Sequence, residues 1–177
     1  NMLIGIAGNF PPEAALSIIE NTIVPDTSSL PTSYPPQNFS VVAGNQIQLV
    51  HDKDNQYQFL WCFPVNDVGA DTKTWINLLC RILDDGFSSR LQRHIREERG
   101  LVYDISGDTD FFHNSGCFSI QGVVGVDKLE ELMDVLTSLI SDLCKSGINQ
   151  DELKLARLRY LASLDFNLDS SEGLLFN

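Results

Sequence analysis

The pattern of apolar and polar residues changes several times along the first part of the chain. Residues 2–7 (MLIGIA) form a short apolar run, which is typical of a buried strand. Residues 11–23 follow, with proline where the first turn of a helix tolerates it. Residues 24–38 are rich in Pro, Ser and Thr and are interpreted as a connecting loop. We therefore expect a strand, a helix and an irregular connection.

Strict alternation of apolar and polar residues is found on both sides of the turn-like sequence Asp-Lys-Asp-Asn at residues 52–55. Ile47 and Leu49 alternate with glutamines before this turn, and aromatic residues alternate after it, which predicts an antiparallel hairpin. The alternating aromatic residues are Tyr57, Phe59, Trp61 and Phe63.

Helical spacing replaces this alternation after Asp71, whose side chain suits an N-cap, and it ends at Gly86. A second, shorter helix is predicted over residues 88–98, capped by a serine at its start, with Gly100 at the left-handed position after its end. The apolar positions of the first of these helices are Trp75, Leu78, Leu79, Ile82 and Leu83.

Two long helices are predicted near the end of the chain. Asp127 with Glu130 resembles a capping box, and an apolar stripe follows as far as Gly147. Asn149 with Glu152 repeats the start signal for a final helix. The two stripes are Leu129, Leu132, Met133, Leu136, Ile140 and Leu143, and then Leu153, Ala156, Tyr160, Leu164 and Leu168.

Residues 102–107 and 116–124 have the composition of strands and are separated by a polar segment, which predicts a second hairpin. The predicted order is therefore β, α, β, β, α, α, β, β, α, α. Helices grouped in this way can cover one face of a largely antiparallel sheet, which is an α+β fold. With 177 residues, of which 43% are hydrophobic, the chain is long enough for one domain with its own core.

Charge and cysteine usage exclude several classes of function. The 24 acidic residues outnumber the 12 basic ones, and a net charge of −12 disfavours nucleic acid and anionic membranes as partners. No apolar run approaches the length of a membrane span. No pair of cysteines has the spacing of a zinc or redox motif, so the four are interpreted as buried thiols. They are Cys62, Cys80, Cys117 and Cys144.

The most informative stretch is LDDGFSSRLQRHIREERGLVYDIS at residues 83–106. This stretch resembles the pattern of the insulinase and mitochondrial-processing-peptidase family of zinc metallopeptidases (M16, inverzincins). The matching features, in order, are small residues, Ser-Ser-Arg-Leu, an arginine, Gly-Leu and a tyrosine. Residues 1–20 resemble the first strand and helix of the C-terminal, noncatalytic half-domain of that family, and residues 145–165 resemble its last helical turn and helix. The resemblance covers nearly the whole chain.

The resemblance implies a LuxS/processing-peptidase-like metallohydrolase fold and a single half-domain over residues 1–177. The chain opens on NMLIGIAG, without the features of a signal peptide, and looks like a piece of a longer peptidase. The compartment stays open between cytoplasm and periplasm. The resemblance places zinc, its His-x-x-Glu-His motif and the general base in the half-domain that is missing, so this chain contributes no catalytic residue and should be inactive alone.

Arg96 and Tyr103 match an arginine and a tyrosine, seven positions apart, that reach toward bound peptide in this family. A guanidinium offers several fixed donors to peptide carbonyls, and a phenol can donate to a carbonyl or to a developing oxyanion. Spacing alone favours a simpler interpretation, in which Arg96 complements the negative end of its helix and Tyr103 packs in the next strand. The resemblance favours a role in substrate binding.

Other candidate chemistry is rejected. His94, Glu97 and Glu98 give His-x-x-Glu-Glu, which lacks the second histidine of an inverted zinc motif. His51 lies at the end of a predicted strand beside a turn and His113 lies in a polar loop, so no metal site is expected in this chain. The serines at 88 and 89 are expected to cap a helix and not to act as nucleophiles.

The turn at residues 84–86 departs from the glycine-rich character that is common in the family, because Asp84 and Asp85 make it acidic and less flexible. We find no counterpart of the glycine-rich loop of the presequence-recognising processing subunit.

The leading hypothesis is a half-domain that closes the substrate chamber of a zinc endopeptidase and contacts peptide. Its partners would be peptide substrate and the catalytic N-terminal half-domain or a homologous subunit, with a homodimer among the assemblies that the resemblance allows. The alternative is a noncatalytic scaffold or companion subunit, similar to the core proteins of respiratory complexes. A third reading, a peptide-binding α+β module, rests on architecture alone.

Overall fold

A computed structural model describes residues 4–23, 44–50, 53, 55–66, 68–112 and 115–176, and it divides into two compact units. One unit is Ser40–Leu161, and the other combines Asn1–Phe39 with Ala162–Asn177. None of the helices in the described ranges is both long enough and apolar enough to cross a membrane.

In chain order the elements are α1 (Pro12–Thr22), β1 (Gln56–Asn66), α2 (Ala70–Leu83), η1 (Gln92–Glu97), β2 (Val102–Phe111), β3 (Ser115–Gly125), η2 (Val126–Lys128), α3 (Leu129–Ser146), α4 (Gln150–Leu168) and α5 (Ser171–Phe176).

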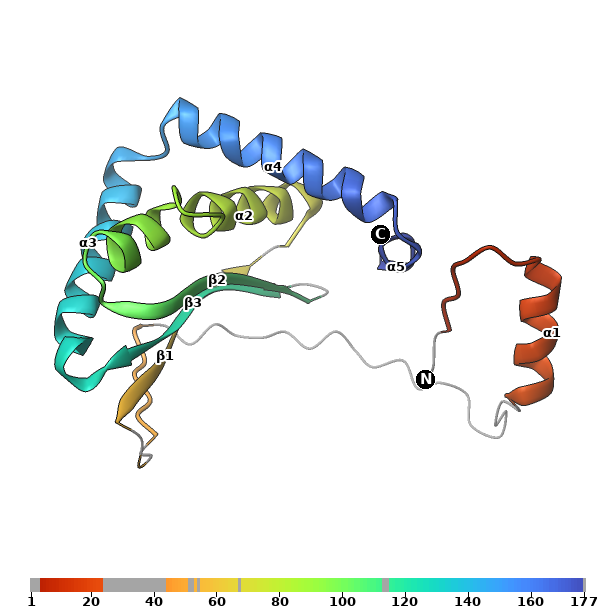
Figure 1. The fold of residues 1–177 in the computed structure, drawn as a ribbon, viewed down its shortest axis with the longest axis horizontal. Coiled ribbons are helices and arrows are strands. Elements are labelled where there is room, and N and C mark those ends of the chain that lie inside the picture. Colours follow the sequence, from red (N-terminus) through yellow and green to blue (C-terminus); the bar gives the residue numbers. More distant parts are fainter. Residues whose placement is uncertain are drawn as a thin grey trace. The chain divides into compact units, whose positions relative to one another are not determined.

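The larger unit is built on a three-stranded antiparallel sheet with the order β1-β3-β2 (Figure 1). β2 and β3 form the predicted hairpin, with Gly107 opposite Ile120. On its other side β3 pairs with β1, where Trp61 lies opposite the same Ile120. The predicted α+β architecture with an antiparallel sheet is therefore confirmed.

The predicted hairpin between residues 46–49 and β1 is wrong for the described residues, because residues 45–50 form no strand and β1 pairs with β3. Residues 45–50 lie outside regular structure, and the side chains of Ile47 and Leu49 are 88% and 89% exposed. Alternation indicates which face of a strand is buried but does not identify the strand's partner. The strand predicted over residues 2–7 is likewise absent from the described residues 4–7.

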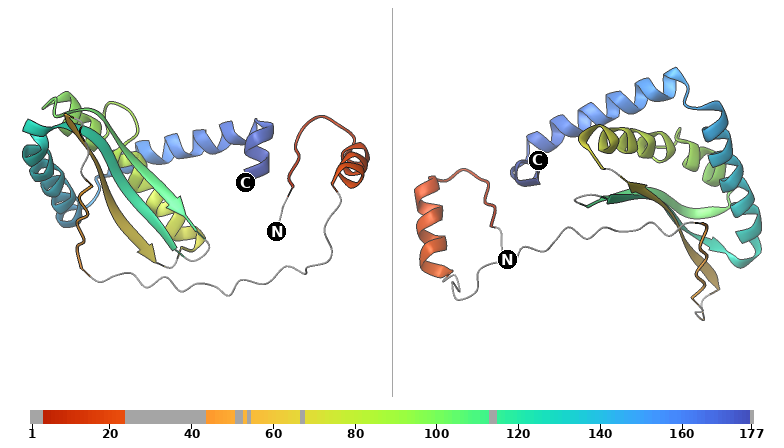
Figure 2. Two further views of the ribbon diagram at one scale, coloured as in Figure 1. Left: turned by 90° about the horizontal axis from the view of Figure 1, so that it is seen from below. Right: turned by 180° about the vertical axis from the view of Figure 1, so that it is seen from behind.

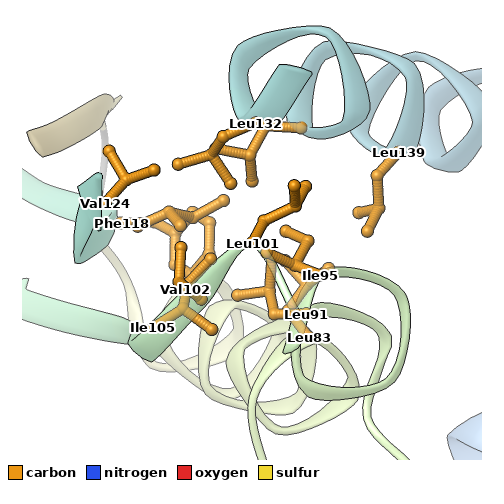
Figure 3. Packing of buried hydrophobic residues seen from close by; sticks show 12 residues of the cluster. Leu83, Leu91, Ile95, Leu101, Val102, Ile105, Phe118, Val124, Leu132 and Leu139 are labelled. Atoms are coloured by element: carbon orange, nitrogen blue, oxygen red, sulfur yellow. The ribbon is translucent and has the colours of Figure 1, made fainter. Parts of the chain in front are cut away.

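α2, η1 and α3 cover one face of the sheet, as predicted, and the core lies between them and the strands (Figures 1 and 2). Figure 3 shows Phe118 and Val124 of β3 near Leu132 of α3. Leu91, which precedes η1, and Ile95 of η1 belong to the same cluster. Phe59, Trp61 and Phe63 of β1 pack against this core through one face of the strand. The buried set is Leu83, Leu91, Ile95, Leu101, Val102, Ile105, Phe118, Ile120, Val124, Leu132, Leu136 and Leu139.

The predicted helix starts are confirmed in one case and corrected in two. The Asn149 side chain accepts from the Glu152 amide at 2.8 Å, and the Asn149 amide donates to the Glu152 carboxylate at 3.1 Å, which is the expected capping box. α2 starts after Gly69, so Asp71 lies inside its first turn. Asp127 lies in the 3₁₀ turn η2, and α3 starts without a side-chain cap.

The first part of α4 packs against α2, where Ala156 forms a small buried cluster with Leu78 and Ile82. Three positions of the predicted stripes, Trp75, Met133 and Leu168, are exposed. The interpretation of all four cysteines as buried thiols is wrong for Cys62 and Cys144, which are exposed, while Cys80 and Cys117 are half-buried; all four are free thiols. Cys62 lies on the exposed face of β1, opposite the face through which Trp61 and Phe63 pack against the core.

The smaller unit contains α1, the end of α4 and α5. α1 begins at Pro12, as the proline rule predicts, and none of its residues is buried. α5 was not predicted.

Candidate functional site

The site candidates lie on η1 and on the start of β2. η1 is a π-helical turn in which the Glu98 amide donates to the Arg93 carbonyl, five residues back, at 2.9 Å. Gly100 ends this turn with φ +58°, the left-handed conformation that the sequence predicted. Its amide donates to the Arg96 carbonyl at 2.9 Å, and the Leu101 amide donates to the Ile95 carbonyl at 3.0 Å. Isolated π-turns are frequent at functional sites.

Arg96 lies in the last turn of η1 with an exposed side chain. Its guanidinium donates to the Gln92 side-chain oxygen at 3.5 Å, and in the described ranges it has no ion-pair partner. The neighbouring Arg93 and Arg99 both pair with Glu98, at 2.9 and 3.4 Å. Arg96 is therefore a cation whose charge is not neutralised by a neighbouring carboxylate.

The carbonyl groups at the end of η1 are held by other cations. Arg99 donates to the His94 carbonyl at 2.6 Å, and Lys128 donates to the Gly100 carbonyl at 2.9 Å. Both contacts place positive charge at the negative end of the helix. The simpler interpretation of Arg96 as a cation for this helix end is thus weakened, because Arg99 and Lys128 already occupy that position.

Tyr103 is 87% exposed, so the interpretation of this residue as packed in its strand is wrong. The register of β2 on β3 shifts between Val102 and Asp104, and Tyr103 is the extra residue. Such a bulge bends the strand and re-aims a side chain. Successive strand residues face opposite sides, so Tyr103 faces away from the core that buries Val102. The bulge explains why the next residue, Asp104, is exposed as well.

One core anchors both candidate residues. Ile95 and Val102, which immediately precede Arg96 and Tyr103, belong to the same buried cluster (Figure 3). The backbone of η1 and that of β2 are therefore fixed on the same core, while the two candidate side chains are exposed. Their exposure was not predictable from the sequence pattern.

A hydrogen-bonded group that sequence reasoning missed connects η1 to β2. The Gln92 side-chain amide donates to the Asp84 carboxylate at 2.9 Å and to the Ile105 carbonyl at 2.8 Å. The second oxygen of Asp84 accepts from the Gly107 amide at 2.8 Å. The sequence identifies Asp84 only as a residue that replaces the usual glycine of this turn. The spacing of Asp84, Gln92 and Gly107 along the chain does not predict that they contact one another.

Cys80 completes the contacts of this group with β2. Its thiol donates to the Gly107 carbonyl at 3.2 Å. Burial, and then the negative charge of Asp84, raise the pKa of Cys80 to about 11, so the thiol keeps its proton at neutral pH.

Two arginines also contact the acidic turn at residues 84–86, through Asp85. Asp85 pairs with Arg81 at 2.9 Å, and its backbone carbonyl accepts from Arg159 of α4. Gly86 follows with φ +84°.

The serine predicted to cap the second helix acts differently. The Ser89 hydroxyl donates back to the Gly86 carbonyl at 2.7 Å, and no side-chain cap is found at η1. Its hydroxyl therefore closes the preceding turn.

The rejected metal motif is engaged in surface contacts. His94 Nδ1 lies 2.9 Å from the Glu98 carboxylate, and hydrogen bonds from His94 and then Arg93 lower the pKa of Glu98. Within the part of the chain that the structure describes, no three His, Cys, Asp or Glu side chains gather closely enough to hold a metal ion. His51 and His113 lie outside the described residues.

Comparison with known proteins places the chain among peptidase relatives. The uncharacterized zinc protease YmxG of Bacillus subtilis is 28% identical over 107 residues, which cover 60% of this chain and 26% of the relative. An uncharacterized zinc protease of Rickettsia bellii is 26% identical over 164 residues, which cover 93% of this chain and 39% of that protein. The chain thus spans about a quarter of the first of these relatives and well under half of the second.

Solved structures agree with this relationship. A peptidase M16 inactive domain from Pseudomonas fluorescens is 25% identical, with a TM-score of 0.56 over 62% of this chain and 26% of that one. A protease from Helicobacter pylori is 20% identical, with a TM-score of 0.76 over 95% of this chain and 42% of that one, and it shares the fold. The family described as Peptidase M16 inactive domain matches residues 1–160. This chain therefore belongs to the Peptidase M16 inactive domain family.

Proposed function

We propose that residues 1–177 form the noncatalytic half-domain of a zinc-dependent endopeptidase, which closes a chamber around extended peptide and contacts that peptide through Arg96 and Tyr103. The relatives named zinc proteases support a peptidase as the parent protein. The inactive-domain family supports a noncatalytic role for this part of it.

The proposal rests on one observation, which is that the side chains of Arg96 and Tyr103 are exposed and have hydrogen-bond donors available. Tyr103 is 87% exposed at a bulge, and Arg96 has no carboxylate partner among the described residues. Most large aromatic residues bury their rings, and the other arginines of η1 and its end are paired or bonded to carbonyls. Both groups keep donors free for an incoming partner, and the carbonyls of an extended peptide are suitable acceptors.

The described part of the chain offers no cluster of ligands for zinc. The relatives named zinc proteases and the inactive-domain family support a zinc site in the catalytic half-domain of the parent protein, where a bound metal would supply a Lewis acid and a nucleophilic water. The role of this chain is then to bind and orient peptide. Its partner in that role is the catalytic half-domain or a homologous subunit.

The test uses the full-length protein with its catalytic half. Turnover of an unstructured peptide is measured for Arg96→Ala and Tyr103→Phe, with folding checked by circular dichroism. Loss of a charged hydrogen bond costs about 1.5–3 kcal/mol, so kcat/KM is expected to fall roughly 10- to 100-fold for Arg96→Ala. Arg93→Ala is the matched control, because Arg93 lies on the same helix and pairs with Glu98.

Unchanged turnover in both variants would contradict the substrate role of Arg96 and Tyr103. Full-length protein that folds but cleaves no peptide in the presence of zinc would favour the alternative, a noncatalytic scaffold or companion subunit.

A further inference from the structure

We propose that Asp84 and Gln92 are positioning residues, which hold Arg96 at a set place relative to Tyr103. This inference rests on the proposed function, because it concerns the same two peptide contacts. The group of Asp84, Gln92 and the β2 backbone at Ile105 and Gly107 is called the bracket below.

The first step is the orientation of the Gln92 side chain. Its amide nitrogen carries two hydrogens, and both have acceptors, at the Asp84 carboxylate and the Ile105 carbonyl. With both donors used, the side-chain oxygen must point away from these acceptors. That oxygen is the group that accepts from Arg96 at 3.5 Å.

The second step is the anchoring of Asp84. One carboxylate oxygen accepts from Gln92 and the other from the Gly107 amide, so the carboxylate spans from η1 to β2. Asp84 directly follows α2 and is half-buried. A charged acceptor strengthens both hydrogen bonds.

The third step is the placement of the bracket on the sheet. β2 pairs only with β3 among the described strands, so its other side is an open edge. Successive residues of a strand direct their amides and carbonyls to alternate sides, and Ile105 and Gly107 both receive bracket contacts. The bracket therefore occupies the open edge of β2, two to four residues beyond Tyr103.

These steps connect the two proposed peptide contacts. Arg96 lies on η1 and Tyr103 lies on β2, and Gln92 is the side chain that bonds η1 directly to the backbone of β2 while also accepting from Arg96. A shift of η1 along β2 would break the bracket. The bracket thus limits how far the guanidinium can move from the phenol.

A structural role alone would also explain the bracket, since unpaired backbone groups at a sheet edge are costly. The two roles predict different energetic coupling between the bracket residues and Arg96. A positioning residue acts on turnover through Arg96, whereas a residue that only stabilises the fold lowers turnover to the same extent whether or not Arg96 is present.

The experiment is a double-mutant cycle on turnover of an unstructured peptide by the full-length protein, normalised to the folded fraction. Asp84→Asn keeps the shape of the side chain but replaces one acceptor oxygen by a donor, which faces either Gln92 or Gly107. Asp85→Asn is the matched control, because it removes the same charge from the same turn and leaves the bracket intact. Gln92→Met serves as the second bracket variant, and it is used in the cycle if Asp84→Asn does not fold.

We expect Asp84→Asn to lower kcat/KM by about tenfold alone and by less than about twofold when Arg96→Ala is already present. Asp85→Asn should stay within about twofold of the unaltered protein. Equal effects of Asp84→Asn with and without Arg96, equal effects of Asp84→Asn and Asp85→Asn, or failure of both bracket variants to fold would overturn the inference. If Arg96→Ala itself leaves turnover unchanged, the proposed peptide contact of Arg96 fails and the inference falls with it.

Discussion

Arg90 and Glu152 form a bidentate ion pair, with the arginine Nε and Nη2 atoms 2.8 and 2.7 Å from the two carboxylate oxygens. The same guanidinium donates to the Gly147 carbonyl at 3.1 Å, and the same carboxylate accepts from the Asn149 amide. Sixty-two residues separate the two partners in the sequence. The pair therefore fixes the start of α4 and the end of α3 to the segment that carries the candidate site.

This pair makes the stability of the chain sensitive to acid. The hydrogen bond from Arg90 is the main cause that lowers the pKa of Glu152. A carboxylate with a lowered pKa in the folded state stabilises the fold above its unfolded pKa of 4.5, and this contribution is lost as pH falls through the folded pKa. We expect Glu152→Gln to lower the free energy of unfolding by about 1–3 kcal/mol at pH 7, and the difference to shrink below about pH 4.

Denaturant unfolding of the chain at several pH values checks this expectation. Glu130→Gln is the control, because Glu130 is an exposed carboxylate in the first turn of α3. A loss that is equal for the two variants, or that does not change with pH, would contradict the role of the ion pair.

The two sides of this contact show what the sequence could and could not predict. Asn149 and Glu152 are three residues apart, and their capping box was predicted because it depends on local chain geometry. The bond from Glu152 to Arg90 was missed, because a pairing across the fold leaves no periodic signal in one sequence. The same distinction explains why the alternating face of β1 was recognised and its partner strand was not.

The candidate site follows the same pattern. Arg96 and Tyr103 could be nominated from their spacing and the family resemblance, and Gly100 from its place after the helix. The bulge at Tyr103 depends on the register of β2, and the contact of Asp84 with Gln92 depends on the packing of η1. Neither is specified by residue types at short range.

Gly100 supplies a test of the turn that connects η1 to β2. Its φ of +58° is unfavourable for any side chain, and a Cβ at this position would meet no atom within 4 Å. Gly100→Ala should therefore destabilise the chain by about 1–2 kcal/mol through backbone strain alone. Gly69→Ala is the matched control, because Gly69 has φ −73° and equal space, and it should stay within about 0.5 kcal/mol. Equal effects in thermal unfolding would argue against a strained turn.

The thiols should differ sharply in reactivity. The pKa of Cys80 is raised to about 11 by burial and by Asp84, whereas Cys144 is exposed. Iodoacetamide reacts with the thiolate, so at pH 8 Cys144 should be alkylated well before Cys80, as peptide mass spectrometry can measure. Equal rates at pH 8 would contradict the burial of Cys80.

The raised pKa of Cys80 also has a consequence for stability at alkaline pH. The unfolded thiol loses its proton near pH 9, while the folded one keeps it to about 11. The folded state therefore binds more protons in this window, and stability falls as pH rises from about 9 to 11. In Cys80→Ala this part of the decline should be missing from a titration of the free energy of unfolding.

Core and surface leucines provide a test of the packing of the helices on the sheet. Leu136 of α3 is fully buried, whereas Leu158 of α4 is 58% exposed. Leu136→Ala should cost about 2–5 kcal/mol of unfolding free energy, and Leu158→Ala less than about 1 kcal/mol. Similar costs in denaturant unfolding would place α3 away from the core.

The most direct test of the central claim is contact between position 103 and a peptide. A photo-crosslinking phenylalanine analogue replaces Tyr103 in the full-length protein, and in a second variant it replaces Tyr57, an exposed tyrosine of β1. The measurement is the yield of covalent adduct with an unstructured peptide after irradiation. We predict adduct at position 103, reduced by Arg96→Ala, and little at position 57. No adduct at position 103, or equal yields at both positions, would contradict the account.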